Sequence, residues 1–188
     1  MIDLIKGQKV NLQKDSPTVQ VFGIGCGWNP QKSNGQSFDL DASIIMLSNG
    51  KMKTDKSIVY YNNPKSTCGS VLHSGDNLTG EGEGDDEVIK VDLSKVPSDV
   101  NELLIVVNIY DAKARRQNFG QVKDAFIRIF DANGDKTKSI MRYDLSEDFS
   151  TQIAVTFGRL YKHNDEWKFE ANGTGVDGGL NEYLQMYK

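Results

Sequence analysis

The chain is organised around Ser74-Gly-Asp-Asn-Leu-Thr-Gly-Glu-Gly-Glu-Gly-Asp-Asp-Glu87, an acidic stretch that leads directly into Val88-Ile-Lys-Val-Asp-Leu93. The acidic stretch holds six carboxylates and no lysine or arginine. The whole chain has a formal charge of -4, so removing these six negative charges would leave it at +2. The negative charge is therefore a local feature of this stretch and not a property of the whole surface.

Folding this stretch brings like charges together. Two like charges about 4 Å apart repel by roughly 4 kcal/mol at an effective dielectric constant near 20. The glycines at 75, 80, 82 and 84 permit tight turns that aim carboxylates and carbonyl oxygens at one centre. Hard oxygen ligands suit Ca²⁺ first and Mg²⁺ second, whereas zinc and copper recruit Cys and His. The stretch therefore predicts a site for a hard divalent cation.

A solvated linker is the alternative interpretation of an acidic, glycine-rich composition. The position of the stretch argues against it, because Ile89, Val91 and Leu93 alternate as one buried strand face directly after it. The residue order is not that of an EF-hand, and the resemblance to a glycine-rich β-helix repeat is a single copy without a tandem array. We therefore favour a metal site inside the domain over a linker.

A second acidic element lies in Ser37–Leu47, which the pattern predicts to be a strand. Asp39 and Asp41 alternate with apolar residues, so we expect their carboxylates to share one face. On an exposed face such a pair is usually only solvated, but convergence with the acidic stretch on one ion is the sharper hypothesis. Asn62 and Asn63 are weaker candidates for oxygen ligands, since Asn-Asn-Pro is more often a turn.

The remaining pattern is that of an all-β protein. Glu102–Tyr110 is almost continuously apolar and β-branched, which predicts a central strand that is buried on both faces. We expect further short strands over 9–12, 18–22, 57–61, 88–93, 124–130, 139–145, 152–157 and 166–170, and one short helix over 180–187. The prediction is a single domain over residues 1–188, a β-sandwich of two mainly antiparallel sheets with a short C-terminal helix.

The glycines and cysteines near the N-terminus are a smaller signal. Gly23, Gly25 and Gly27 alternate after a predicted strand, which indicates a close backbone approach or a bulge, or else only a weakened strand end. Cys26 and Cys68 are expected to be reduced and partly buried. The sequence lacks an apolar segment of the roughly 20 residues that a membrane helix needs, and we expect a cytoplasmic protein that binds no nucleic acid.

Several of these segments, taken in order, resemble the tellurium-resistance TerD family, which includes bacterial general stress proteins. The resemblance is carried by Gly27-Trp28, Phe38-Asp-Leu-Asp-Ala-Ser43, Asn62-Asn63, Gly75–Glu87, Ile109-Tyr-Asp-Ala112, Phe119-Gly-Gln-Val122, Ala125-Phe-Ile-Arg128 and Tyr143-Asp-Leu-Ser146. The opening Met1-Ile-Asp-Leu-Ile5 departs from the Ser-Leu-x-Lys-Gly start that is associated with the family.

The resemblance implies a β-sandwich that binds calcium and has no established catalytic activity. It implies metal ligands among Asp39, Asp41, Asp76, Asn77, Glu81, Glu83, Asp85, Asp86 and Glu87. These are more oxygens than one Ca²⁺ uses, so we expect two ions. It also implies other tellurium-resistance proteins as partners, so that any membrane association would be indirect, through a complex.

Two rival functions follow from the same residues. A metal-dependent phosphoester hydrolase would use the acidic cluster to position a water molecule, but His73 and His163 suggest no base or nucleophile set. Direct thiol chemistry on tellurite would need a reactive cysteine. We predict a calcium-binding stress protein that is not an enzyme.

Overall fold

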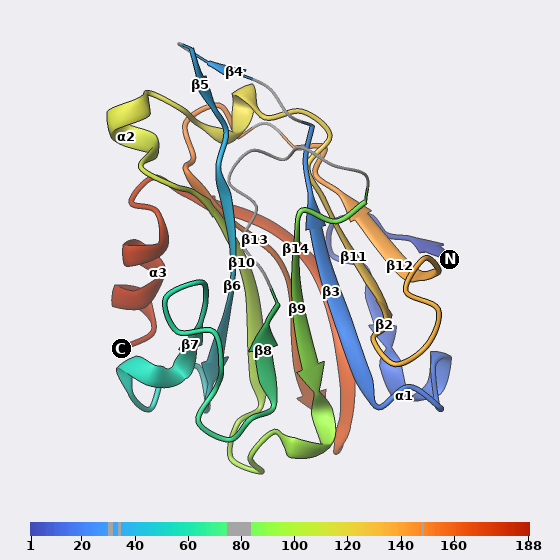
Figure 1. Ribbon diagram of the computed structural model, residues 1–188. Coiled ribbons are helices and arrows are strands. Elements are labelled where there is room, and N and C mark those ends of the chain that lie inside the picture. Colours follow the sequence, from blue (N-terminus) through green and yellow to red (C-terminus); the bar gives the residue numbers. More distant parts are fainter. Residues whose placement is uncertain (30–31, 34, 75–83, 148) are drawn as a thin grey trace.

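Two six-stranded sheets packed face to face form the protein, as the computed structural model shows (Figure 1). The structure describes residues 1–29, 32–33, 35–74, 84–147 and 149–188. The first sheet has the strand order β1 (Ile2–Asp3), β12 (Ser139–Asp144), β11 (Phe126–Asp131), β3 (Val21–Gly27), β9 (Glu87–Asp92), β8 (Val71–His73). The second has the order β2 (Lys9–Asn11), β14 (Glu166–Val176), β13 (Ala154–His163), β10 (Glu102–Ile109), β6 (Leu40–Leu47), β7 (Ile58–Val59).

All strand pairs within the two sheets are antiparallel except β1 with β12, which is parallel. The predicted β-sandwich of two mainly antiparallel sheets is therefore confirmed. A small ribbon of β4 (Lys32–Ser33) and β5 (Gln36–Ser37) stands beside them. The short helices are α1 (Leu12–Asp15), α2 (Ala112–Arg115), α3 (Leu180–Met186) and the 3-10 turns η1 (Asp55–Ser57), η2 (Leu93–Lys95) and η3 (Phe119–Gln121).

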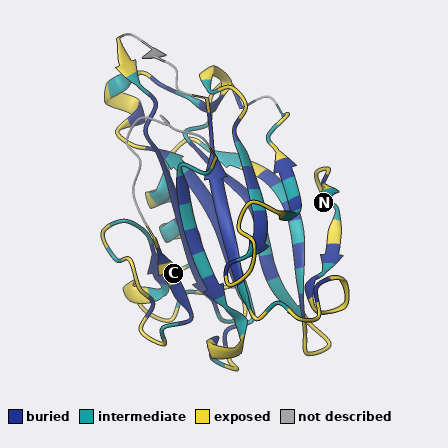
Figure 2. Cartoon of the chain, turned by 45° about the vertical axis from the view of Figure 1, so that its right-hand side comes forward, coloured by how far each residue is buried: buried dark blue, intermediate teal, exposed yellow. Residues whose placement is uncertain are grey.

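The main core fills the space between the sheets, and a second, smaller core lies outside the second sheet. Buried residues are concentrated on the strands (Figure 2). Strand β10 contributes to both, because Leu103, Ile105 and Val107 face the main core while Leu104 and Val106 face the smaller one. The prediction that this strand is central and buried on both faces is confirmed. Helix α3 covers the smaller core through the buried Tyr183, and its predicted helical spacing is also confirmed.

The alternate glycines of β3 mark a close approach of neighbouring side chains. The phenyl ring of Phe130 lies over Gly23, the carboxylate of Asp85 over Gly25 and the ring of Phe126 over Gly27. A Cβ atom added at any of the three would fall within 2.5 Å of the covering side chain. The close-approach interpretation is therefore correct, and the glycines lie inside a strand that the sequence predicted to end at residue 22.

Some strand limits differ from those that the sequence predicts. The predicted strand over 57–61 shortens to β7, because Thr54 caps the 3-10 turn η1 and draws Ser57 into it. Helix α2 and strand β8 were not predicted as separate elements. In the described part of the chain, every helix is too short or too polar to span a bilayer.

Candidate metal site

The residues predicted to bind metal come from four places in the chain, of which the structure describes two. Asp39 and Asp41 lie at the start of β6, and Asp85, Asp86 and Glu87 lead into β9. The other predicted ligands, Asp76, Asn77, Glu81 and Glu83, lie outside the described residues. Five of the nine predicted ligands therefore belong to the described residues.

Glu87 is the most deeply buried of the five. It alternates with Ile89 and Val91 on the inner face of β9, so its side chain enters the space between the two sheets. There its Oε2 accepts a hydrogen bond from the backbone N–H of Ala42 in the opposite sheet. His73 Nε2 lies 3.5 Å from the same oxygen. Glu87 thus connects the end of the acidic stretch to the Asp-Leu-Asp segment.

Asp41 is buried on the side of β6 that faces away from the main core. Its partner in the sheet register is Asn108 of β10, whose Nδ2 donates to Asp41 Oδ2 at 3.1 Å. Both side chains line a large cavity outside the second sheet. Asp41 is 4% exposed, so its charge lies in a setting that favours compensation by a cation or by donors.

Asp39 lies two residues earlier and contacts a different group. Its Oδ2 is 3.6 Å from Arg115 Nη1, and its backbone oxygen accepts from the N–H of Tyr110. Asp39 and Arg115 line a second cavity, of about 340 Å³, with Gln36 and Ser37. The two aspartates therefore border different cavities, although both are buried.

Asp86 is held by the backbone of the first sheet. Its N–H donates to the oxygen of Cys26 at 2.8 Å, and its Oδ2 accepts from the N–H of Trp28 at 2.9 Å. Partial burial raises the pKa of the Asp86 carboxyl, the Trp28 hydrogen bond opposes this, and the neighbouring charge of Asp85 raises it further. Burial and the charge of Asp85 therefore outweigh the Trp28 hydrogen bond in their effect on the pKa of this carboxyl.

Asp85 has a partner of its own. Arg128 of β11 binds both of its oxygens, and the pair lies on the outer face of the first sheet. Asp85 therefore has a role in packing, whatever it contributes to a metal site.

The thiol of Cys26 lies near the last acids of the stretch. It is buried in the main core, and burial raises its pKa. The charges of Glu87, Asp86 and Asp85 raise the pKa of this thiol further, in that order. The three carboxylates lie near the end of β3 but on different faces of the first sheet, since Glu87 enters the space between the sheets and Asp85 lies on the outer face.

The described residues do not complete a metal site by themselves. Among them, no group of three or more His, Cys, Asp and Glu side chains has the spacing to hold an ion. Asn63 donates its amide to the oxygen of Ile58 at 2.6 Å and so closes the predicted turn, while Asn62 lines the large cavity. The predicted ligand set, including its number of ions, stays a prediction.

Sequence reasoning missed two features near these residues. One is the Asp85–Arg128 pair. These two residues are distant in the sequence and meet only because the fold brings the segments that carry them together. The other is the large cavity, whose signal was the run of aromatic and amide residues Tyr60-Tyr-Asn-Asn63 beside Asn108 and Tyr110.

Comparisons with known proteins bear on the whole chain. The family described as TerD domain matches residues 1–187. The tellurium resistance protein TerD of Serratia marcescens is 50% identical over 187 residues, which cover 99% of this chain and 96% of that protein. General stress protein 16U of Bacillus subtilis is 49% identical over 95% of this chain and 93% of its own length.

A solved structure gives the same fold at lower identity. A homologue of telluride resistance protein from Streptomyces coelicolor superposes with a TM-score of 0.72 and 15% identity, covering 88% of this chain and 95% of that one. At this identity the likeness shows the fold alone.

Proposed function

Because the chain belongs to the TerD family of tellurium-resistance and stress-response proteins, we propose that it is a calcium-binding protein without catalytic activity. In this proposal Ca²⁺ neutralises the acidic stretch, orders it and thereby completes a surface for partner proteins. The cytoplasmic location and the association with other tellurium-resistance proteins that the sequence predicts are parts of the same proposal.

One observation carries the proposal. The last three acids of the stretch, Asp85, Asp86 and Glu87, all raise the pKa of one buried thiol. The pKa of Asp86 is itself raised, as burial and Asp85 act on it. A cation bound at this end would relieve the repulsion and lower that pKa again.

The chemistry of the donors fits calcium better than a softer metal. The predicted set is made of carboxylate and amide oxygens, which Ca²⁺ accepts in groups of six to eight. His73 is already beside Glu87 inside the sandwich, and the Cys26 thiol is held protonated by its raised pKa. Neither offers the coordination that zinc prefers.

Thermal unfolding in EGTA and in calcium tests the proposal. A ligand that binds only the native state stabilises it by RT ln(1 + [L]/Kd), which is about 2.7 kcal/mol at a hundredfold excess over Kd. We expect Ca²⁺ to raise the melting temperature and Mg²⁺ to raise it less. Equal melting temperatures in EGTA and in millimolar calcium, with no heat of binding by calorimetry, would end the proposal.

The partner surface needs its own experiment. Tagged protein is used to capture partners from stressed cells with and without EGTA, beside an Asp86→Asn variant. Capture that depends on calcium and is weakened by the substitution supports the proposal, whereas identical capture in both buffers contradicts it.

No observation on the described residues favours the hydrolase alternative. His73 is buried against Glu87, and His163 lies on the β13–β14 hairpin with its Nδ1 3.2 Å from Lys168 Nζ. Neither histidine lines the large cavity that could admit a substrate.

A further inference from the structure

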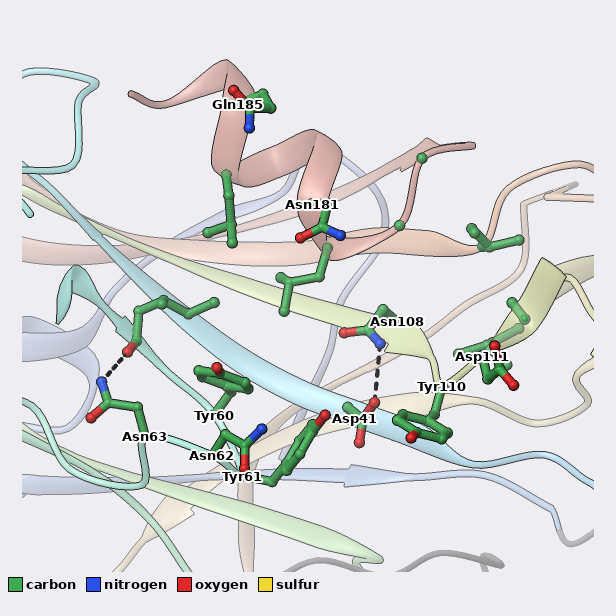
Figure 3. A pocket seen from close by; sticks show the side chains of 18 of the residues that line it. Asp41, Tyr60, Tyr61, Asn62, Asn63, Asn108, Tyr110, Asp111, Asn181 and Gln185 are labelled. Carbon is green, nitrogen blue, oxygen red and sulfur yellow. Dashed lines mark hydrogen bonds between the residues drawn. The ribbon is translucent and has the colours of Figure 1, made fainter. Parts of the chain in front are cut away.

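A cavity of about 880 Å³ lies outside the second sheet, between α3 and the segment that follows β7 (Figure 3). Its floor is formed by β6 and β10, and its volume lies in the range of small-molecule sites. Polar and aromatic side chains surround it, among them Asp41, Tyr60, Tyr61, Asn108, Tyr110 and Asn181. The proposed calcium function uses Asp41 but makes no use of this aromatic wall.

The floor presents hydrogen-bond acceptors. Asp41 Oδ2 accepts a hydrogen bond from Asn108 Nδ2 at 3.1 Å. The other polar atom of this amide is the oxygen of Asn108. That oxygen is fully buried and has no hydrogen-bond partner among the residues that the structure describes. Because this oxygen is fully buried, a ligand in the cavity does not reach it, and the carboxylate of Asp41 is the floor group that favours a positively charged ligand.

Three tyrosines stand beside this floor in an edge-to-face chain. The ring centres of Tyr60 and Tyr61 are 5.2 Å apart at an interplanar angle of 76°, and those of Tyr61 and Tyr110 are 6.5 Å apart at 77°. The faces of tyrosine rings attract cations. One of these rings already carries a cation, because the guanidinium of Arg115 lies 5.1 Å from the centre of Tyr110.

The charges at the rim nearly balance. Lys56, Lys113 and Lys188 are set against Asp55 and Asp111, so the buried carboxylate of Asp41 distinguishes the floor from the rim. Arginine, the residue that best binds phosphate groups, is not among the residues that line the cavity in the described chain. A nucleotide with several phosphates would therefore find little to hold it.

From this geometry we propose that the cavity binds a small organic molecule through its ammonium group. The ammonium group lies between the carboxylate of Asp41 and the tyrosine rings. The remainder of the ligand extends toward the amides of Asn181 and Gln185 on α3. An anionic group on the same ligand would meet the rim lysines, so a zwitterion is also accommodated.

Calorimetric titration with choline tests the charge requirement directly. Its carbon isostere 3,3-dimethyl-1-butanol has the same shape and no charge, and ethanolamine keeps the charge with a smaller head group. All titrations are made in EGTA, so that calcium cannot occupy Asp41. We expect saturable binding of choline or ethanolamine with a Kd below about 1 mM, and at least about tenfold weaker binding of the isostere.

Two tyrosine variants provide a matched comparison. Tyr110→Leu removes a cavity ring that is 44% exposed, so the substitution leaves no hole in either core. Tyr161→Leu removes a ring on β13 that likewise lies under an arginine, with Arg159 4.8 Å from its centre, but is not part of the cavity. We expect Tyr110→Leu to weaken choline binding at least about fivefold and Tyr161→Leu to leave it unchanged.

The outcomes separate this proposal from the calcium function. Asp41→Asn should abolish choline binding, and a circular dichroism spectrum shows whether that variant is folded. Equal binding of choline and its isostere, preference for glucose over choline, or no binding of any ammonium compound would each overturn the proposal. Calcium titrations of the wild type and of Tyr110→Leu are run separately, so a failure of either activity is visible without the other.

Discussion

Arg128 binds both carboxylate oxygens of Asp85, with Nε 2.6 Å from Oδ1 and Nη2 2.7 Å from Oδ2. The pair is largely buried, and the guanidinium also stacks on Phe130 at 4.4 Å from the ring centre. Since the carboxylate rests on the backbone of Gly25, the acidic stretch is fixed at its C-terminal end to the centre of the first sheet. The first two predictions test this attachment.

Arg128→Gln should lower the free energy of unfolding by about 2–4 kcal/mol. The substitution leaves the Asp85 carboxylate buried without a charged partner, which is the costly way to break such a pair. Urea unfolding in EGTA measures the change. Arg142→Gln is the matched control, because Arg142 lies directly opposite Arg128 in the register, stacks on Phe126 and pairs with Asp144.

The control pair is more exposed than the first pair, and it is local, since Asp144 lies two residues from Arg142 on the same strand. Its side chains are 31% and 60% exposed, against 15% and 6% for Arg128 and Asp85. Exposed pairs contribute about 0–1 kcal/mol, so Arg142→Gln should cost less than 1 kcal/mol. Similar losses from both substitutions would show that burial of the Asp85 pair is not what matters.

Gly25→Ala should destabilise the fold by about 1–3 kcal/mol, as overpacking does. The added Cβ would lie 2.2 Å from the carboxyl carbon of Asp85, so either the strand or the pair must move. The same substitution made on an Asp85→Ala background should cost less, because the colliding atoms are gone. Equal costs on both backgrounds, measured by urea unfolding, would contradict the contact.

Asp86→Asn should leave the calcium-free protein at least as stable as the wild type at neutral pH. The pKa of the Asp86 carboxyl is raised in the folded state, so the folded protein holds this proton more tightly than the unfolded chain. The contribution of Asp86 to stability therefore falls as the pH rises from the usual aspartate pKa through the raised value. Asparagine lacks this titration, yet its amide oxygen can still accept from Trp28.

Melting temperatures in EGTA, measured against pH for both proteins, check the sign. As the pH rises, the melting temperature of the variant should increase relative to that of the wild type. The stabilisation by calcium should be smaller in the variant. A variant that melts lower than the wild type at neutral pH in EGTA would show that the charge of Asp86 is well compensated without a metal.

The two cysteines should react at very different rates. Cys26 is buried and its pKa is raised by burial and by the three nearby acids. Cys68 is exposed, and although partial burial raises the pKa of its thiol, hydrogen bonds with Ser70 and Ser66 together lower this pKa overall. Iodoacetamide should therefore label Cys68 in the native protein and leave Cys26 unlabelled, as peptide mass spectrometry would show.

Ser70→Ala should slow the labelling of Cys68, because the hydroxyl lies 3.0 Å from the sulfur and stabilises the thiolate. Equal labelling of the two cysteines would show that the main core opens on the time scale of the reaction. The result also indicates which thiol could take part in chemistry with tellurite.

The fold could be predicted because its signals are local in the sequence. Ile89 and Val91 alternate with more polar residues, which predicts one buried face for β9. The apolar run of β10 predicts burial on both faces, and the structure confirms both predictions. Strand limits were harder, because the end of β3 is decided by side chains from β11 and from Asp85 and not by its own glycines. Side chains from other segments cover the outer face of β3, so the residues of β3 itself do not show where the strand ends.

The candidate site could be predicted in composition and only in part in geometry. The sequence shows that carboxylates are concentrated, but not that Arg128 takes up Asp85 or that Arg115 lies near Asp39. Those pairs join residues that are far apart in the chain, and the charge of a residue does not by itself predict which residue it pairs with. The tyrosine cavity was missed for the same reason, since α3, β6, β10 and the segment after β7 each supply a part of it.

The outer face of β3 carries glycines where other strands carry side chains, and this limits how the sequence can change in evolution. Position 25 must stay without a side chain only while an acid at 85 and an arginine at 128 occupy the space above it. A lineage that lost the arginine would be released from keeping the acid, and then from keeping the glycine. The three positions should accordingly be exchanged as a set among related chains, and seldom one at a time.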